Sequence, residues 1–207
     1  MAAAKAFCAA AMLLLLGLAG CGGMKPEQFA GAEPRLRVEE YFLGKTRGWG
    51  IFEDRFGNLR RQFVVDIEGS WQHDNQGDVF VMQEQFAYSD GATETRTWRI
   101  RKTAADRYEG TAGDVVGTAQ GQAAGNALNW RYELDLKVGD STWRVKFDDW
   151  MFLQPDGILM NRARVSKWGI AVGEVTLMFQ RWPRQEQAAL APAGVRAPAT
   201  RPRAAAE

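Results

Sequence analysis

The sequence predicts an all-β protein, an antiparallel up-and-down β-barrel of about ten strands. Apolar and polar residues alternate with a period of two along successive runs, and turn-forming residues separate these runs. No run between residues 35 and 182 has the periodicity of a long amphipathic helix, which the crossovers of a parallel sheet would need. The second face of each run is charged, whereas a barrel that spans a membrane would be apolar there. We therefore expect a soluble barrel closed around its own apolar side chains.

The chain begins with a segment typical of a bacterial lipoprotein signal peptide. Lys5 precedes an apolar run, residues 6–16, that is too short to span a bilayer. The sequence Leu-Ala-Gly-Cys, ending at Cys21, then matches a lipobox. We expect removal of residues 1–20 and lipidation of the Cys21 thiol, which would tie the protein to a membrane. By similarity to known lipoproteins, a glycine after this cysteine indicates the periplasmic face of the outer membrane.

The remaining chain divides into three parts. Residues 21–34 are expected to form a flexible tether. The barrel domain is expected over residues 35–182, which hold all eight tryptophans and can bury a large core. Residues 183–207 are rich in Ala, Pro and Arg, lack apolar periodicity and are expected to be disordered. Because Cys8 lies in the removed leader, no disulfide is expected.

The strands of the barrel domain follow from the alternation. Residues 128–136 are apolar at every even position and polar between, and residues 63–71 alternate in the same way at odd positions. Further alternating positions are Phe80, Met82, Glu84, Phe86, Tyr88, Trp98, Ile100, Tyr108, Trp143, Val145, Phe147, Val175, Leu177 and Phe179. Turn signals lie at residues 56–58, 74–77, 89–91, 125–126, 139–140 and 155–157. Consecutive hairpins of this kind favour an up-and-down barrel.

Composition excludes several classes of protein. A net charge of +1 from 26 basic and 25 acidic residues argues against a nucleic-acid partner. The single histidine, His73, lies beside a turn, so common zinc sites and a Ser-His-Asp triad away from His73 are excluded. Calcium binding by Asp74, Asn75 and Asp78 is a weaker interpretation than a polar turn. We expect no metal and no cofactor.

Asp148 and Asp149 interrupt the alternation. Odd positions face inward before them, whereas Trp150 continues the apolar face at an even position, which predicts a β-bulge at this pair. A bulge would turn one carboxylate into the interior beside Asn161 or Arg162. That carboxylate would form the polar floor of a cavity or act as a general acid; the alternative is a structural carboxylate that caps backbone N–H groups or pairs with an arginine.

Glu84 and Arg96 also depart from the pattern, because each is charged on the apolar face of its run. A short turn joins the two runs, which predicts a cross-strand ion pair or the head-group end of a cavity.

Small residues from Gly110 to Gly125 indicate interior space or tight curvature. The complete candidate cavity cluster is Glu84, Arg96, Trp130, Asp148, Asp149, Trp150, Asn161 and Arg162.

Short motifs run through the whole predicted domain. They are Gly48-Trp49-Gly50, Asp54-Arg55-Phe56-Gly57, Asp114 with Gly117, Gly125-Asn126-Ala127, Trp130, Asp148-Asp149-Trp150-Met151, Asn161-Arg162-Ala163 and Gly173-Glu174-Val175-Thr176. Together they resemble an uncharacterised family of Gram-negative envelope lipoproteins, a domain of unknown function. The resemblance implies an exported lipoprotein of this size and implies no reaction.

A second similarity is to lipocalin-like (calycin) barrels. These place a Gly-x-Trp motif on the first strand and an arginine of the last strand across the tryptophan. Here Trp49 follows Gly48 directly rather than after one residue, and Arg181 lies in the last predicted strand. The resemblance implies that Arg181 packs across Trp49.

Three functions stay open at this point. The leading one is a non-catalytic, lipid-anchored periplasmic barrel that binds an apolar or amphipathic small molecule or serves envelope maintenance. The second is a barrel with a solid core that binds an envelope protein. The third is a hydrolase that uses Asp148 or Asp149. Whether the barrel is hollow decides between the first two.

Overall fold

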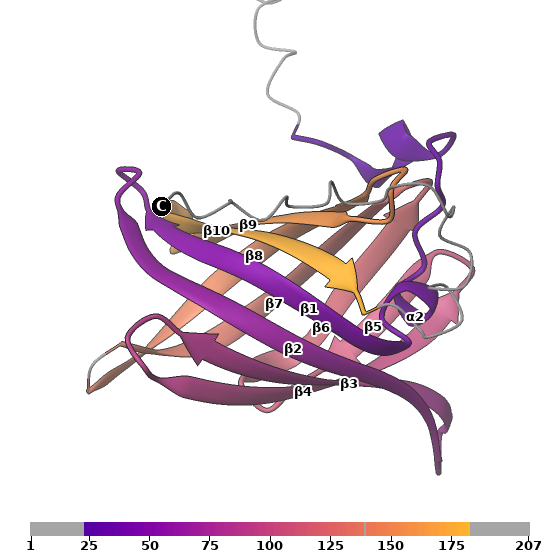
Figure 1. Ribbon diagram of the computed structural model, residues 1–207, viewed down its shortest axis with the longest axis horizontal. Helices are drawn as coiled ribbons and strands as arrows, with labels where there is room; N and C mark the ends of the chain where they lie inside the picture. The colour runs from indigo at the N-terminus through magenta and orange to yellow at the C-terminus, as the bar shows by residue number, and fades with distance from the viewer. Residues whose placement is uncertain (1–22, 139, 183–207) are drawn as a thin grey trace, which may run out of the picture.

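A computed structural model describes residues 23–138 and 140–182 (Figure 1). The predicted signal peptide, lipidation at Cys21 and disordered tail lie outside the described residues. The two short helices are η1 (Pro26–Phe29) and α2 (Val38–Tyr41). The strands are β1 (Gly44–Asp54), β2 (Leu59–Asp74), β3 (Gly77–Tyr88), β4 (Thr93–Ala104), β5 (Arg107–Thr111), β6 (Val115–Ala124), β7 (Ala127–Val138), β8 (Ser141–Leu153), β9 (Leu159–Lys167) and β10 (Ile170–Arg181).

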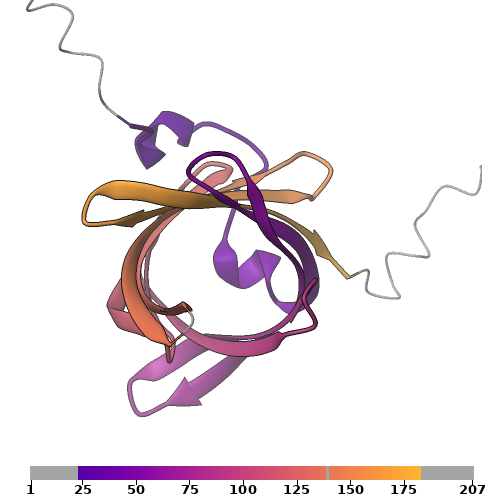
Figure 2. The ribbon, with the colours of Figure 1, turned by 90° about the vertical axis from the view of Figure 1, so that its left-hand side faces the viewer.

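These ten strands form one closed barrel. Each strand pairs antiparallel with the next along the chain, and β1 pairs with β10 to close the wall from Thr46↔Arg181 to Asp54↔Gly173. Figure 2 shows the ring of strands. The predicted all-β, antiparallel up-and-down barrel is therefore confirmed. Within residues 44–138 and 140–181 the strands follow one another without a helix between them, so consecutive strands pair antiparallel.

The helix α2 fills one end of the barrel. It lies within the ring of strands in Figure 2. Leu36, Val38, Tyr41 and Phe42 are all buried and belong to the main apolar core. The Tyr41 hydroxyl donates to the carbonyl oxygens of Gly157, at 3.1 Å, and Phe179, at 3.0 Å. These hydrogen bonds fix α2 to the surrounding strands, so that α2 closes this end of the barrel.

The helix η1 packs on the outside of β8. Phe29 makes edge contacts with Trp150 and Phe152, with ring centroids 5.9 and 5.3 Å apart. Glu27 accepts a hydrogen bond from Gln122 of β6, at 2.6 Å. Part of the expected tether is thus packed against the barrel, because Phe29 buries the apolar surface of two outward aromatic side chains, Trp150 and Phe152.

The predicted bulge at Asp148 and Asp149 is wrong. Both residues pair in unbroken register with β7 and with β9. Odd positions of β8 stay inward, so Trp150 points outward, and the shelter that η1 gives it explains the apolar residue there. The register shifts occur elsewhere, at Phe52/Glu53, Ala171/Gly173, Lys102/Ala104 and Val116/Gln120.

Two glycines of the small-residue stretch make room for Trp130. A Cβ on Gly110 would lie 2.6 Å from the indole ring, and one on Gly121 would overlap it. The ring also packs edge-on against Trp98, at 5.8 Å between centroids. The glycines therefore let a large aromatic side chain fill this part of the interior, rather than leaving it empty.

Candidate ligand-binding cavity

The barrel encloses a cavity between α2 and the hairpins at the opposite end. A cavity of about 720 Å³ extends from Val38 and Phe42 at the α2 end to Asp54, Arg60 and Lys137 near the opposite hairpins. This volume lies within the range of small-molecule sites, roughly 300–1,000 Å³. Its aromatic lining residues are Phe42, Phe52, Phe63, Phe86, Tyr88, Trp98, Trp130, Tyr132, Trp143, Phe147 and Phe179. The wall is thus mostly apolar.

Glu84 and Arg96 lie on this wall as cross-strand partners in β3 and β4, as predicted. The nearest atoms of the pair, Arg96 Nη1 and Glu84 Oε2, are 3.9 Å apart. The guanidinium lies closer to a second carboxylate: its Nη2 donates to Asp114 Oδ2 at 2.6 Å, and its Nε donates to the same carboxylate at 3.0 Å. It also lies 3.6 Å from Glu94. Arg96 therefore joins three carboxylates rather than one.

Glu84 is the most isolated of these carboxylates. The residue is 9 % exposed, and its Oε2 has no hydrogen-bond partner. Burial raises the pKa of Glu84 to about 7, although the positive charge of Arg96 opposes the shift. Near neutral pH this carboxyl group therefore exchanges between its charged and neutral forms.

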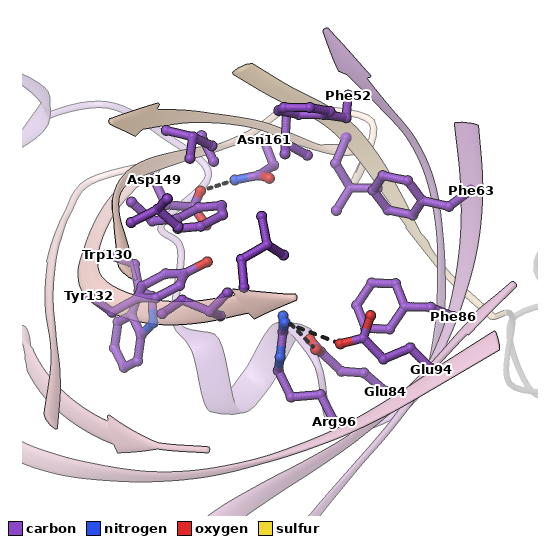
Figure 3. Close-up of a pocket in the computed structure, with 18 of the residues that line it drawn as sticks. Phe52, Phe63, Glu84, Phe86, Glu94, Arg96, Trp130, Tyr132, Asp149 and Asn161 are labelled. Carbon is purple, nitrogen blue, oxygen red and sulfur yellow. Dashed lines mark hydrogen bonds and ion pairs between the residues drawn. The ribbon is translucent and has the colours of Figure 1, made fainter. Parts of the chain in front are cut away.

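Asp149 faces the cavity from β8. The residue is 7 % exposed, and the Asn161 side-chain amide of β9 donates to its Oδ1. Burial raises the pKa of Asp149 to about 7 against this hydrogen bond. The sequence correctly predicted one inward carboxylate beside Asn161, but regular strand alternation places it there, without a bulge. Figure 3 shows both buried acids around the same space.

Tyr132 is a cavity residue that the site prediction missed. Its ring stacks on Phe147, with centroids 4.9 Å apart, and its hydroxyl points into the lumen (Figure 3). Burial, followed by the nearby Asp149 charge, raises the pKa of Tyr132 well above its ordinary value, so the phenol stays protonated. The alternation of residues 128–136 already placed it inward, which was the signal available.

Three of the predicted cluster residues lie outside the barrel instead. Asp148 accepts hydrogen bonds from Asn129, at 2.7 Å, and Arg131, at 3.2 Å. Arg162 pairs with Glu174, at 2.9 Å, and Trp150 lies under η1. Their even positions put them on the outer face, so they cannot share a site with the inward residues Glu84, Arg96, Trp130, Asp149 and Asn161.

The Asp74 turn does not form a calcium site. Its carboxylate is bound by Arg99, at 2.7 Å, and by Arg101, at 2.6 Å, while Asp78 is 2.8 Å from the exposed His73. Within residues 23–138 and 140–182, no three His, Cys, Asp or Glu side chains are grouped to hold a metal. No helix in this part of the chain has the length and apolar character needed to cross a bilayer.

The tryptophan–arginine contact implied by the lipocalin resemblance is not formed. Trp49 is 40 % exposed, because Gly48 takes the inward position. Arg181 pairs with Thr46, three positions earlier in β1.

The closed ring, the plugged end and the internal cavity define a lipocalin-like β-barrel. A family described as "Protein of unknown function (DUF3833)" matches residues 15–181, and the chain belongs to this family. This confirms the predicted uncharacterised domain family.

Solved structures that are similar to this chain include the two described here. The S-type phycobiliprotein lyase CPES from Guillardia theta has 11 % identity and a TM-score of 0.55, over 78 % of this chain and 100 % of that one. A protein of unknown function from the DUF3598 family of Nostoc punctiforme has 15 % identity and a TM-score of 0.48, over 73 % of this chain and 51 % of that one. The first likeness supports the fold. No match was found among curated proteins.

Proposed function

We propose that this protein is a non-catalytic, lipid-anchored barrel that binds an apolar or amphipathic small molecule in its interior. The hollow of about 720 Å³ carries this proposal. A filled barrel would have no room for a ligand, so the hollow interior argues against the alternative of a solid core.

The lining suits a molecule with a long apolar part. Burial of apolar surface stabilises a complex by roughly 25 cal/mol per Å², before the costs of association are subtracted. The aromatic rings form a preformed apolar wall. Glu84, Asp149 and Tyr132 add polar groups to this wall. A few polar groups in an otherwise apolar pocket are the usual means of orienting a ligand.

The same geometry disfavours a hydrolase. Asp148 and Asp149 point to opposite faces of the wall, and Asp148 is engaged by Asn129 and Arg131. Glycoside hydrolases use two carboxyl groups that face one substrate, an arrangement that Asp148 and Asp149 cannot form. The inward Asp149 is bound by the Asn161 amide, which orients it for binding.

The lipobox at Cys21 supports a membrane anchor on the periplasmic face of the outer membrane, where the barrel would store or carry its ligand for envelope maintenance. The helix η1, which follows the predicted anchor in sequence, packs on the outer wall through Phe29 and does not occupy the lumen.

The cavity is tested by filling it. Ala163 lines the lumen and is 2 % exposed, so Ala163→Phe places a ring inside the hollow. Ala87→Phe places the same ring on the outer surface of β3 and is the matched control. We expect the neutral fluorescent probe N-phenyl-1-naphthylamine to bind the wild-type protein and the control, and to bind Ala163→Phe about tenfold more weakly.

Mass spectrometry of the gently extracted protein checks for a co-purified apolar molecule. An empty wild-type barrel that also fails to bind the probe contradicts the proposal. Equal probe affinity of the two folded variants contradicts the location of the site.

A further inference from the structure

Negative groups outnumber positive ones at the middle of the lumen. In the described chain, Arg96 contacts the carboxyl groups of Glu84, Glu94 and Asp114. Figure 3 shows Glu84 and Glu94 beside Arg96, with Asp149 on the facing wall. The other basic side chains of the lining, Arg60, Arg61 and Lys137, belong to the hairpin end of the cavity. The region of the cavity around Arg96 and Asp149 therefore carries more acidic than basic groups.

Asp114 accepts hydrogen bonds from two nitrogens of Arg96, Nε and Nη2. Both carboxylate oxygens of Asp114 accept from the guanidinium, at distances from 2.6 to 3.1 Å. Such a two-point contact compensates the charge of Asp114 well. Glu84, at 3.9 Å from Arg96, feels the charge of the guanidinium, but its Oε2 receives no hydrogen bond from it.

The buried Oε2 of Glu84 has no hydrogen-bond donor. An acceptor taken out of water without a donor costs free energy, and a charged one costs more. On the opposite wall, Asn161 donates to Oδ1 of Asp149 and leaves the other oxygen for a ligand. Two buried acids thus face one space in which a donor is missing.

We propose, building on the function above, that the cavity selects amphipathic ligands with a cationic, hydrogen-bond-donating head group, such as a primary ammonium. The ammonium donates to Glu84 Oε2 and Asp149, and the tail lies along the aromatic wall. An anionic head would add negative charge beside these acids. A neutral hydroxyl would supply the missing donor without balancing their charge.

Proton release accompanies this recognition. Burial raises the pKa of Glu84 and of Asp149 to about 7, and a bound cation favours their ionised forms. Besides burial, Arg96, Asp114, Asp149 and Glu94 act on Glu84, and the Asn161 amide and Asp148 act on Asp149. Affinity for an ammonium therefore rises as the pH increases between about 6 and 8, because the acids deprotonate in this range.

The experiment compares four ligands with one tail: dodecylamine, dodecyltrimethylammonium, dodecanol and dodecanoate. Each competes with N-phenyl-1-naphthylamine for the wild-type protein. We expect dodecylamine to bind about tenfold more tightly than dodecanol and dodecanoate. Dodecyltrimethylammonium, which has charge but no N–H, should fall between dodecylamine and the other two.

Glu84→Gln and Asp149→Asn should each remove most of this preference, while Asp148→Asn, the outward neighbour, should retain it. Circular dichroism establishes that each variant is folded. Calorimetry in buffers with different ionisation enthalpies should detect proton release on dodecylamine binding near pH 7, and it tests the wild-type protein without relying on any variant.

The outcomes separate the two proposals. If all four amphiphiles bind equally, if dodecanoate binds best, or if no protons are released, the cationic preference is wrong and the binding function stands. If neither the probe nor any amphiphile binds, both are wrong.

Discussion

Arg96 lies opposite Glu84 across β3 and β4, but it holds Asp114 more tightly: its shortest distance is 2.6 Å to Asp114 and 3.9 Å to Glu84. A residue of the β5–β6 connection thus completes a charge cluster whose other members are strand residues. The cluster thus connects the β5–β6 region of the wall to Glu84 and Arg96, the residues near which we expect the ligand to be recognised.

Loss of Arg96 should destabilise the barrel. Arg96→Met leaves the acids Glu84 and Asp114 without their shared cation, and we expect a decrease of about 3 kcal/mol in the free energy of unfolding, measured with urea. Arg99→Met is the matched control on the outer face of β4, because its partner Asp74 keeps Arg101; it should cost less than about 1 kcal/mol. Equal losses in the two variants would argue against a structural role of the cluster.

A methyl group at Gly121 should strain the interior. The Cβ of Gly121→Ala would overlap the ring of Trp130, so we expect a loss of about 1–3 kcal/mol and a shift in tryptophan fluorescence. Gly113→Ala serves as the control, since nothing lies within 4 Å of its Cβ position. That variant should stay within about 0.5 kcal/mol of the wild type in the same denaturation experiment. A fully stable Gly121→Ala protein would contradict the placement of Trp130.

Stability should depend on pH through the two inward acids. Their pKa values are raised to about 7 in the folded protein, from ordinary values near 4, so the native state binds more protons than the unfolded state between these values. The free energy of unfolding contributed by each group therefore falls as pH rises from about 4 to 7, by at most about 1.4 kcal/mol per pH unit.

Urea titrations of Glu84→Gln and Asp149→Asn over this pH range measure the contribution. In each variant the free energy of unfolding should decrease less with rising pH than in the wild type. Asp148→Asn should show the same pH dependence as the wild type. Parallel curves for the wild type and both inward variants would mean that neither acid is neutral in the fold.

Cys21→Ala should abolish membrane attachment. In a bacterial host that processes lipoproteins, the wild-type protein should incorporate labelled palmitate and sediment with outer membranes, because two or three acyl chains anchor a domain firmly. The variant should incorporate no label and should be recovered in the soluble periplasmic fraction. Palmitate labelling of Cys21→Ala, or an unlabelled wild type, would overturn the predicted lipid anchor.

The alternation of apolar residues was sufficient to predict the barrel, because each strand buries one face and no helix is long enough to connect parallel strands. It also placed Glu84, Arg96 and Trp130 on the inner wall. Periodicity failed at Trp150, since an outward apolar side chain covered by Phe29 resembles an inward one in a one-dimensional pattern.

Other features of the site needed the three-dimensional structure. Asp114 lies in a connection, so no strand period indicates where its side chain points, although the family motifs included it. The hollow itself depends on the sum of many side-chain volumes and on how far α2 enters the ring. Neither quantity is encoded in any short stretch of sequence.

The seam between β1 and β10 sets the order of events in folding. Because the first and last strands are neighbours, the wall cannot be completed until almost the entire chain has been synthesised, and contacts this distant in sequence form slowly. A nascent chain that stops before β10 exposes two unpaired strand edges, which invite aggregation. Late closure would suit the proposed export, in which the polypeptide would cross a membrane in extended form before its first and last strands pair.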